Sequence, residues 1–114
     1  MRIILCDASE HPRIAYEELD GSREGDFFLD AEGVVRYAHP GDGHVWFAAP
    51  DPTSFRRAVE HWIVYLDRGS KAQAEGRVAT LDSLRNALTR LELLPDRPDA
   101  LWPVLLEQAE AGLL

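Results

Sequence analysis

The clearest pattern of hydrophobic and polar positions lies in the middle of the chain. Residues 27–29 and 34–37 are short runs rich in aromatic and β-branched residues, which is typical of strands. The connection 30–33 suits a type I turn closed by a residue with positive φ, and Gly33 adopts that conformation without steric cost. The pattern predicts a hairpin, followed by a third strand over residues 45–48.

The spacing of apolar residues then changes from that of a strand to that of a helix. Asp51 is a suitable N-cap and Pro52 a suitable first helical residue, because the N–H that proline lacks would have no partner there. Gly69 predicts the end of this helix. The apolar face comprises Phe55, Ala58 or Val59, Trp62, Ile63 and Leu66.

Upstream of the hairpin the pattern is weaker. Residues 1–6 are predicted to form a strand because four consecutive apolar residues occupy positions 3–6. Residues 7–25 are mostly polar. Within them, Ile14, Ala15, Glu18 and Leu19 have the spacing of one or two helical turns.

Downstream of the first long helix, residues 68–79 are polar and predict a connector. A second helix is expected over residues 81–93, where leucines recur three and four positions apart. Prolines at positions 95 and 98 break it. A third helix is expected to begin near Trp102–Pro103 and to end at Gly112. Short strands followed by helices indicate an α+β fold, a small antiparallel or mixed meander packed by about three helices, in one domain spanning 1–114.

Composition narrows the classes of function. The chain has 114 residues, 46% of them hydrophobic and 28% charged, as in globular proteins. Its net charge of -8 argues against nucleic-acid or anionic-membrane binding, which requires a basic surface. Cys6 is the only cysteine, so an internal disulfide is excluded and a cytoplasmic location is expected. No window has the length of a transmembrane helix.

Candidate catalytic chemistry is sparse. His39 and His44 flank a glycine-rich loop that contains Asp42, but a zinc site needs three or four convergent ligands. Asp30 and Glu32 resemble the start of a calcium loop without the glutamate at its twelfth position. The sequence has neither a phosphate-binding glycine loop nor a serine elbow. We therefore expect a protein that is not an enzyme and that uses no metal or cofactor.

The C-terminal segment carries a family resemblance. Residues 101–114, LWPVLLEQAEAGLL, resemble the closing segment of actinobacterial SUKH-family immunity proteins, with a Trp-Pro, a leucine-glutamate-glutamine helix, a glycine and terminal leucines. The leucine helix and the break at residues 95–99 are similar to the same family, as are the turn over 30–35 and the strand and helix over 46–62. Members usually have a longer N-terminal region, so we expect either a minimal version of the domain or a chain that pairs with itself or another protein to complete the core.

The resemblance implies a SUKH-like α+β domain that binds and neutralises a bacterial toxin, often a nuclease or deaminase, without catalytic residues. Complementary charge would favour a basic partner. The alternative is a structural or regulatory subunit or a homodimer in a larger cytoplasmic complex, suggested by the leucine-rich second helix. The expected partner-binding residues lie around the hairpin: Asp26, Asp30, Glu32, His39, Asp42 and His44.

Overall fold

The computed structural model describes residues 2–41, 43–74, 79–94 and 98–111. Within them, a five-stranded sheet has the order β1-β2-β3-β4-β5, and every neighbouring pair of strands is antiparallel. The predicted α+β class with an antiparallel meander is confirmed. The strands are β1 (Arg2–Leu5), β2 (Arg13–Leu19), β3 (Ser22–Leu29), β4 (Val35–Ala38) and β5 (Val45–Ala49).

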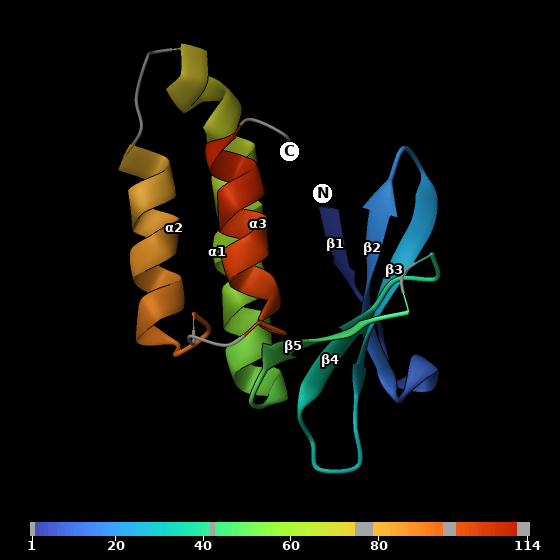
Figure 1. The fold of residues 1–114 in the computed structure, drawn as a ribbon. Helices are drawn as coiled ribbons and strands as arrows, with labels where there is room; N and C mark the ends of the chain where they lie inside the picture. The colour runs from blue at the N-terminus through green and yellow to red at the C-terminus, as the bar shows by residue number, and fades with distance from the viewer. Residues whose placement is uncertain (1, 42, 75–78, 95–97, 112–114) are drawn as a thin grey trace.

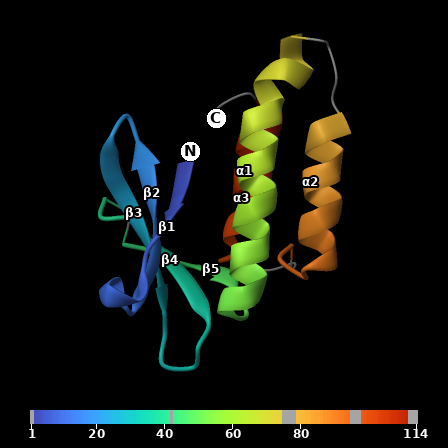
Figure 2. The ribbon, with the colours of Figure 1, turned by 180° about the vertical axis from the view of Figure 1, so that it is seen from behind.

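The long helices all lie on one side of the sheet (Figure 1). They are α1 (Pro52–Ala74), α2 (Ala79–Arg90) and α3 (Leu101–Glu110), while the short 3-10 helix η1 (Ala8–Glu10) precedes β2. Helices α1 and α3 contact β5, and α2 packs on α1 and α3 farther from the sheet, an arrangement that is also seen from behind in Figure 2. The elements therefore form layers: the sheet, then α1 with α3, then α2.

The core lies between the sheet and the α1–α3 layer. The Phe27 ring packs at a tilt against the rings of Tyr37 and Phe55, with centroids 4.8 and 4.9 Å apart. Trp62 meets Trp102 nearly edge to face at 6.0 Å, a favourable geometry for aromatic pairs. The leucines of α2, and Leu91 directly after it, also pack inward: Leu84 and Leu88 are buried, and Leu81 and Leu91 are partly buried against the same cluster. The leucines that recur three and four positions apart in the sequence therefore pack within the core of this chain.

Local sequence signals explain the hairpin and the start of α1. Gly33 has φ +81°, and its N–H donates to the Asp30 carbonyl at 3.1 Å, as the predicted turn requires. The N–H of Ser54 donates to Asp51 Oδ1 at 2.7 Å, which confirms Asp51 as the N-cap. Pro103 lies in the first turn of α3, where a proline is tolerated.

The helical prediction for residues 14–19 is wrong, because these residues form β2 between β1 and β3. The turn after β2 consists of Asp20 and Gly21, with φ of 51° and 82°. Both residues have positive φ, as two-residue hairpin turns of type I′ require, and an Asp-Gly pair is a typical sequence for such a turn. Pairing with a strand on each side, together with complete burial of Ala15, outweighs the weak helical spacing.

The predicted end of the first helix at Gly69 is also wrong. Helix α1 continues to Ala74 and takes up part of the predicted connector over residues 68–79. A glycine inside a helix costs only about 1 kcal/mol relative to alanine, so strong helix formers on both sides can carry the helix through it. The predicted end of α3 at Gly112 lies outside the described residues.

Gly25 leaves room for the buried Tyr37 side chain. A Cβ at Gly25 would lie 2.5 Å from Tyr37 Oη and 2.7 Å from two ring carbons. The ring is 6% exposed, stacks on Phe27 and donates its hydroxyl to Glu17, so it cannot move without losing these contacts. Gly25→Ala should therefore lower the free energy of unfolding by about 1–3 kcal/mol in urea denaturation.

Two further variants make this measurement specific. Gly43→Ala is the matched control, because an added Cβ there meets no atom within 4 Å. Combining Gly25→Ala with Tyr37→Ala should cost less than the sum of the single changes, because the clash disappears with the ring. Strict additivity would contradict the proposed clash.

Candidate binding face on the sheet

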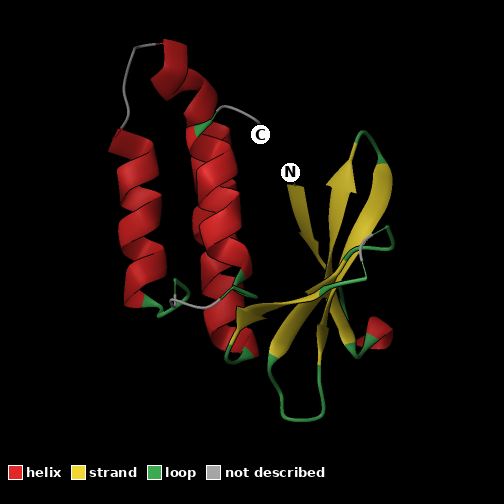
Figure 3. Cartoon of the chain, viewed as in Figure 1, coloured by secondary structure: helices red, strands yellow, loops and turns green. Residues whose placement is uncertain are grey.

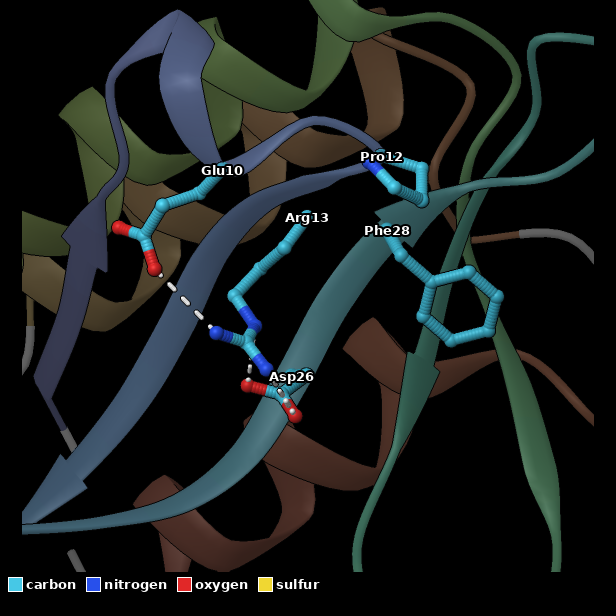
Figure 4. Close-up of a pocket in the computed structure, with 5 residues that line it drawn as sticks. All are labelled: Glu10, Pro12, Arg13, Asp26 and Phe28. Atoms are coloured by element: carbon cyan, nitrogen blue, oxygen red, sulfur yellow. Dashed lines mark hydrogen bonds and ion pairs between the residues drawn. The ribbon is translucent and has the colours of Figure 1, made fainter.

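The sheet has a second face that no helix α1–α3 covers, and we call it the open face. In β3, Gly25 and Phe27 are buried whereas Asp26 and Phe28 are half-buried. In β4 the same alternation places Val35 and Tyr37 toward the helices. Because successive side chains of a strand point to opposite faces, the half-buried residues share the open face. Figure 4 looks onto this face, with the helices behind the strands.

A row of alternating arginine and phenylalanine side chains crosses the open face. The strand register pairs Arg13 with Phe28, Phe28 with Arg36, and Arg36 with Phe47. The Arg36 guanidinium lies 5.9 Å from the centroid of the Phe47 ring, within the range of a cation–π contact. We call these side chains the Arg–Phe row: Arg13, Phe28, Arg36 and Phe47.

A second cross-strand row runs beside the first and is more apolar. Its members are paired in register across all strands of the sheet. The Arg23 guanidinium lies over the Tyr16 ring at 3.9 Å from the centroid, so an arginine also covers part of this row. The row consists of Ile4, Tyr16, Asp26, Ala38 and Val45. The open face thus combines aromatic surface with fixed charges.

Ion pairs hold the arginines of the open face in place. Arg13 Nε lies 2.9 Å from Asp26 Oδ1, and Glu10 Oε1 lies 3.2 Å from a guanidinium nitrogen of both Arg13 and Arg23. With Pro12 and Phe28, three of these residues line an open hollow of about 380 Å³ (Figure 4). Exposed pairs of this kind contribute little to stability, so their main effect is to orient side chains.

Two groups beside the hollow, the Glu10 carboxyl and the Cys6 thiol, have shifted pKa values. The hydrogen bond from Arg23 lowers the pKa of the Glu10 carboxyl, and bonds from Cys6 and Arg13 add to this. Partial burial, and then the hydrogen bond to Glu10, raise the pKa of the Cys6 thiol. Glu10 therefore stays ionised and Cys6 stays protonated near neutral pH, and a protonated thiol is a poor nucleophile.

Arg36 is held by two carboxylates. Its Nε lies 3.2 Å from Asp30 Oδ2, and its NH1 lies 3.8 Å from Asp99 Oδ2. Asp30 Oδ1 also accepts the N–H groups of Glu32 at 2.8 Å and Val34 at 3.0 Å. Asp30 therefore shapes the β3–β4 turn and fixes Arg36 at the same time.

We expect Asp30 to make stability depend on acid pH. Desolvation alone would raise its pKa, but the hydrogen bonds from Val34, Glu32 and Arg36 outweigh it and lower the pKa below the ordinary value. A carboxyl with a lowered folded-state pKa contributes stability above its unfolded pKa, near 3.9, and this stability is lost as pH falls through the folded-state value. Asp30→Asn should therefore destabilise the protein at pH 7, with the difference from wild type vanishing in strong acid.

Urea denaturation between pH 7 and pH 2 measures this dependence. Glu32→Gln, an exposed carboxyl in the same turn, is the matched control and should follow the wild type throughout. A difference between Asp30→Asn and wild type that stays constant across this pH range would contradict the role given to the ionised carboxyl.

The structure separates the partner-binding residues predicted from the sequence. Asp30 and Glu32 lie in the β3–β4 turn, whereas His39 and His44 lie in the β4–β5 loop at the other end of β4 (Figure 3). Asp26 lies between them on the open face, where Arg13 pairs with it. Asp42 lies outside the described residues.

The two loop histidines have different surroundings. His39 accepts a hydrogen bond at Nδ1 from the Gly41 N–H at 3.1 Å, and its Nε2 lies 3.8 Å from Glu24. The His44 ring packs edge-on against Trp46 with centroids 4.5 Å apart. Across the described residues, no group of three or more His, Cys, Asp or Glu side chains could hold a metal ion.

Sequence reasoning missed the Arg–Phe row, which is the most distinctive feature of the open face. The alternation Asp26–Phe27–Phe28 was visible, but without β2 the partner of Phe28 could not be identified. Reading Asp20–Gly21 as a hairpin turn would have aligned residues 13–19 with β3 and revealed the pair formed by Arg13 and Phe28.

The fold is that of an α+β protein with an antiparallel sheet whose open face is not covered by α1–α3. Comparisons with protein-family models, with curated proteins and with solved structures find no match. None of the helices in the described part of the chain is both long and apolar enough to cross a bilayer.

Proposed function

We propose that this chain is a non-enzymatic, SUKH-like immunity protein that binds a bacterial toxin in the cytoplasm through the open face of its sheet. The observation that carries the binding role is the Arg–Phe row on a face without covering helices. Arginine and aromatic side chains are enriched at protein interfaces and at their energetic hot spots. The class of partner rests on the resemblance of the C-terminal segment to SUKH immunity proteins.

The electrostatics of the open face favour a protein partner over a nucleic acid. Arg13, Arg23 and Arg36 each lie in ion pairs with Asp or Glu, so binding phosphates would require those pairs to be broken. The net charge of -8 adds repulsion from any polyanion. A toxin with a basic surface, such as a nuclease or deaminase, would instead be attracted over a longer range.

A protection assay tests the proposal. Secreted toxins of the strain that encodes the chain are expressed one at a time in a susceptible host, with and without this protein. The expected result is restored growth against one toxin, and direct binding of that toxin by the purified protein that weakens with added salt. Failure of the folded, expressed protein to protect against any toxin of that set would overturn the proposal.

The same purified protein distinguishes the immunity role from the alternative, a structural or regulatory subunit. A regulatory or structural subunit would be recovered in a stable cytoplasmic assembly and would give no protection. A complex with one toxin that dissociates as ionic strength rises would instead support the immunity role.

A further inference from the structure

The two edge strands of the sheet, β1 and β5, differ in whether another segment pairs with their outer side. At the β5 edge, the N–H of Phe47 donates to the Asp99 carbonyl at 2.7 Å, and Phe47 forms a parallel bridge with Ala100. At the other edge, no described residue pairs with the outer side of β1. Strand β1 has the sequence RIIL and contains no proline, lysine or bulge, which are the usual protections of an exposed edge.

The backbone groups that β1 presents at this edge can be identified. The N–H of Cys6 donates to the Ile14 carbonyl at 2.9 Å, so Cys6 bonds toward β2. Along an antiparallel strand, residues alternate between bonding to one neighbour and to the other. The backbone groups of Ile4 therefore point toward β2, and the N–H and C=O groups of Ile3 and Leu5 point away from the sheet.

We propose that β1 pairs with β1 of a second copy of this chain to form an antiparallel dimer, with Ile4 opposite Ile4 on the two-fold axis. In this register Ile3 of one copy lies opposite Leu5 of the other, and each such pair exchanges both of its N–H···O=C bonds. The two sheets become one continuous sheet. The contact is made by the edge of β1, which borders the open face, and the proposal does not rest on the toxin-binding function.

Side chains on both faces of β1 fit a second copy in this register. On the helix-facing side, Leu5, which is 41% exposed, gains Ile3 of the other copy as an apolar neighbour. On the open face, Arg2 lies opposite Cys6, whose thiol is hydrogen-bonded to Glu10. The Arg2 side chain is 72% exposed and lies 3.5 Å from Glu18 of its own copy, and in the dimer it would turn toward the Glu10 carboxylate of the other copy.

Two-fold symmetry restricts the ways in which two β1 strands can pair. Two antiparallel edges related by a two-fold axis perpendicular to the sheet keep their helices on the same side. A shift of one residue would place helix-facing side chains opposite residues of the open face, which the burial pattern of the sheet opposes. Because β1 has only 4 residues, we expect a dimer that forms as protein concentration rises, in place of a permanent one.

Sedimentation equilibrium on the full chain, up to about 1 mM, tests the association. Leu5→Pro removes the outward N–H and is tolerated in an edge strand, so it should weaken self-association at least about tenfold while circular dichroism stays unchanged. Leu19→Ala, at a residue 52% exposed outside β1, is the control and should leave it unchanged. A protein that stays monomeric at every concentration, or a folded Leu5→Pro variant that dimerises normally, would overturn the proposal.

Cross-linking tests the register independently of affinity. In a Cys6→Ser background, Ile4→Cys places two thiols opposite each other at a non-hydrogen-bonded pair, where Cα atoms lie about 4.5 Å apart, within disulfide reach. Leu5→Cys in the same background places them about 7 Å apart along the strand, too far for a disulfide. Ile4→Cys should form disulfide-linked dimers at least about tenfold faster under mild oxidation. Equal rates would exclude this register.

Discussion

Trp102→Ala should remove most of the stability of the protein. The side chain is 0% exposed, packs against Trp62, and donates its Nε1–H to the carbonyl of Ala48 at 2.8 Å. Truncating a buried tryptophan costs about 3–5 kcal/mol, whereas domains of this size are stable by only about 5–15 kcal/mol. We expect the midpoint of urea unfolding to fall sharply, and part of the population to be unfolded at 37 °C.

A second substitution separates packing from hydrogen bonding at this position. Trp102→Phe keeps an aromatic ring but leaves the buried Ala48 carbonyl without its donor, and should cost about 1–3 kcal/mol. Val64→Ala, at an exposed position of α1, should change stability by no more than about 0.5 kcal/mol. A Trp102→Ala variant as stable as Val64→Ala would show that α3 does not complete the core.

Phe28→Ala should weaken the proposed binding of a toxin more than any other single truncation on the open face. The ring lies between Arg13 and Arg36 in the Arg–Phe row and borders the hollow beside Asp26. An aromatic side chain at the centre of an interface contributes about 2 kcal/mol or more, which corresponds to roughly 30-fold in Kd. Isothermal titration calorimetry with the toxin identified by the protection assay measures this loss.

The control for Phe28→Ala must lie on the helical side of the molecule. Val64→Ala again serves, because α1 packs on the sheet face opposite the Arg–Phe row. We expect Val64→Ala to leave both the affinity and the melting temperature unchanged. Phe28→Ala should lower the melting temperature only slightly. If Val64→Ala weakened binding and Phe28→Ala did not, the partner would bind the helices.

The middle of the fold was predictable because its signals are local. Gly33 fixes its turn through its positive φ, and Asp51 fixes the start of α1 through its capping carboxylate. Each acts on residues only a few positions away, so a short stretch of sequence is enough to predict the local structure. The apolar spacing from Phe55 to Trp62 likewise reports burial directly. These features identified the hairpin and most of the face of α1 that enters the core, but Ile63, which was predicted to belong to that face, is 47% exposed.

The N-terminal strands and the binding face were not predictable in the same way. Residues 14–19 combine apolar and acidic residues without clear alternation, because a register shift between Arg13 and Ala15 interrupts the period of the strand. The Arg–Phe row exists only when four strands align, so no single stretch of sequence contains it. The predicted partner-binding residues around the hairpin do not form one site. Strand β4 lies between Asp30 and His39, which are at its opposite ends.

The contact between Trp102 and Ala48 joins positions 54 residues apart, and it has a consequence for synthesis of the protein. A ribosome releases the sheet and α1 before it releases α3, so the site on Trp62 that receives Trp102 stays uncovered until α3 follows. A chain that stops short of Trp102 would keep this apolar surface exposed, and exposed apolar surface is what chaperones and proteases act on. Cells would therefore retain chains that reach α3 and remove those that do not.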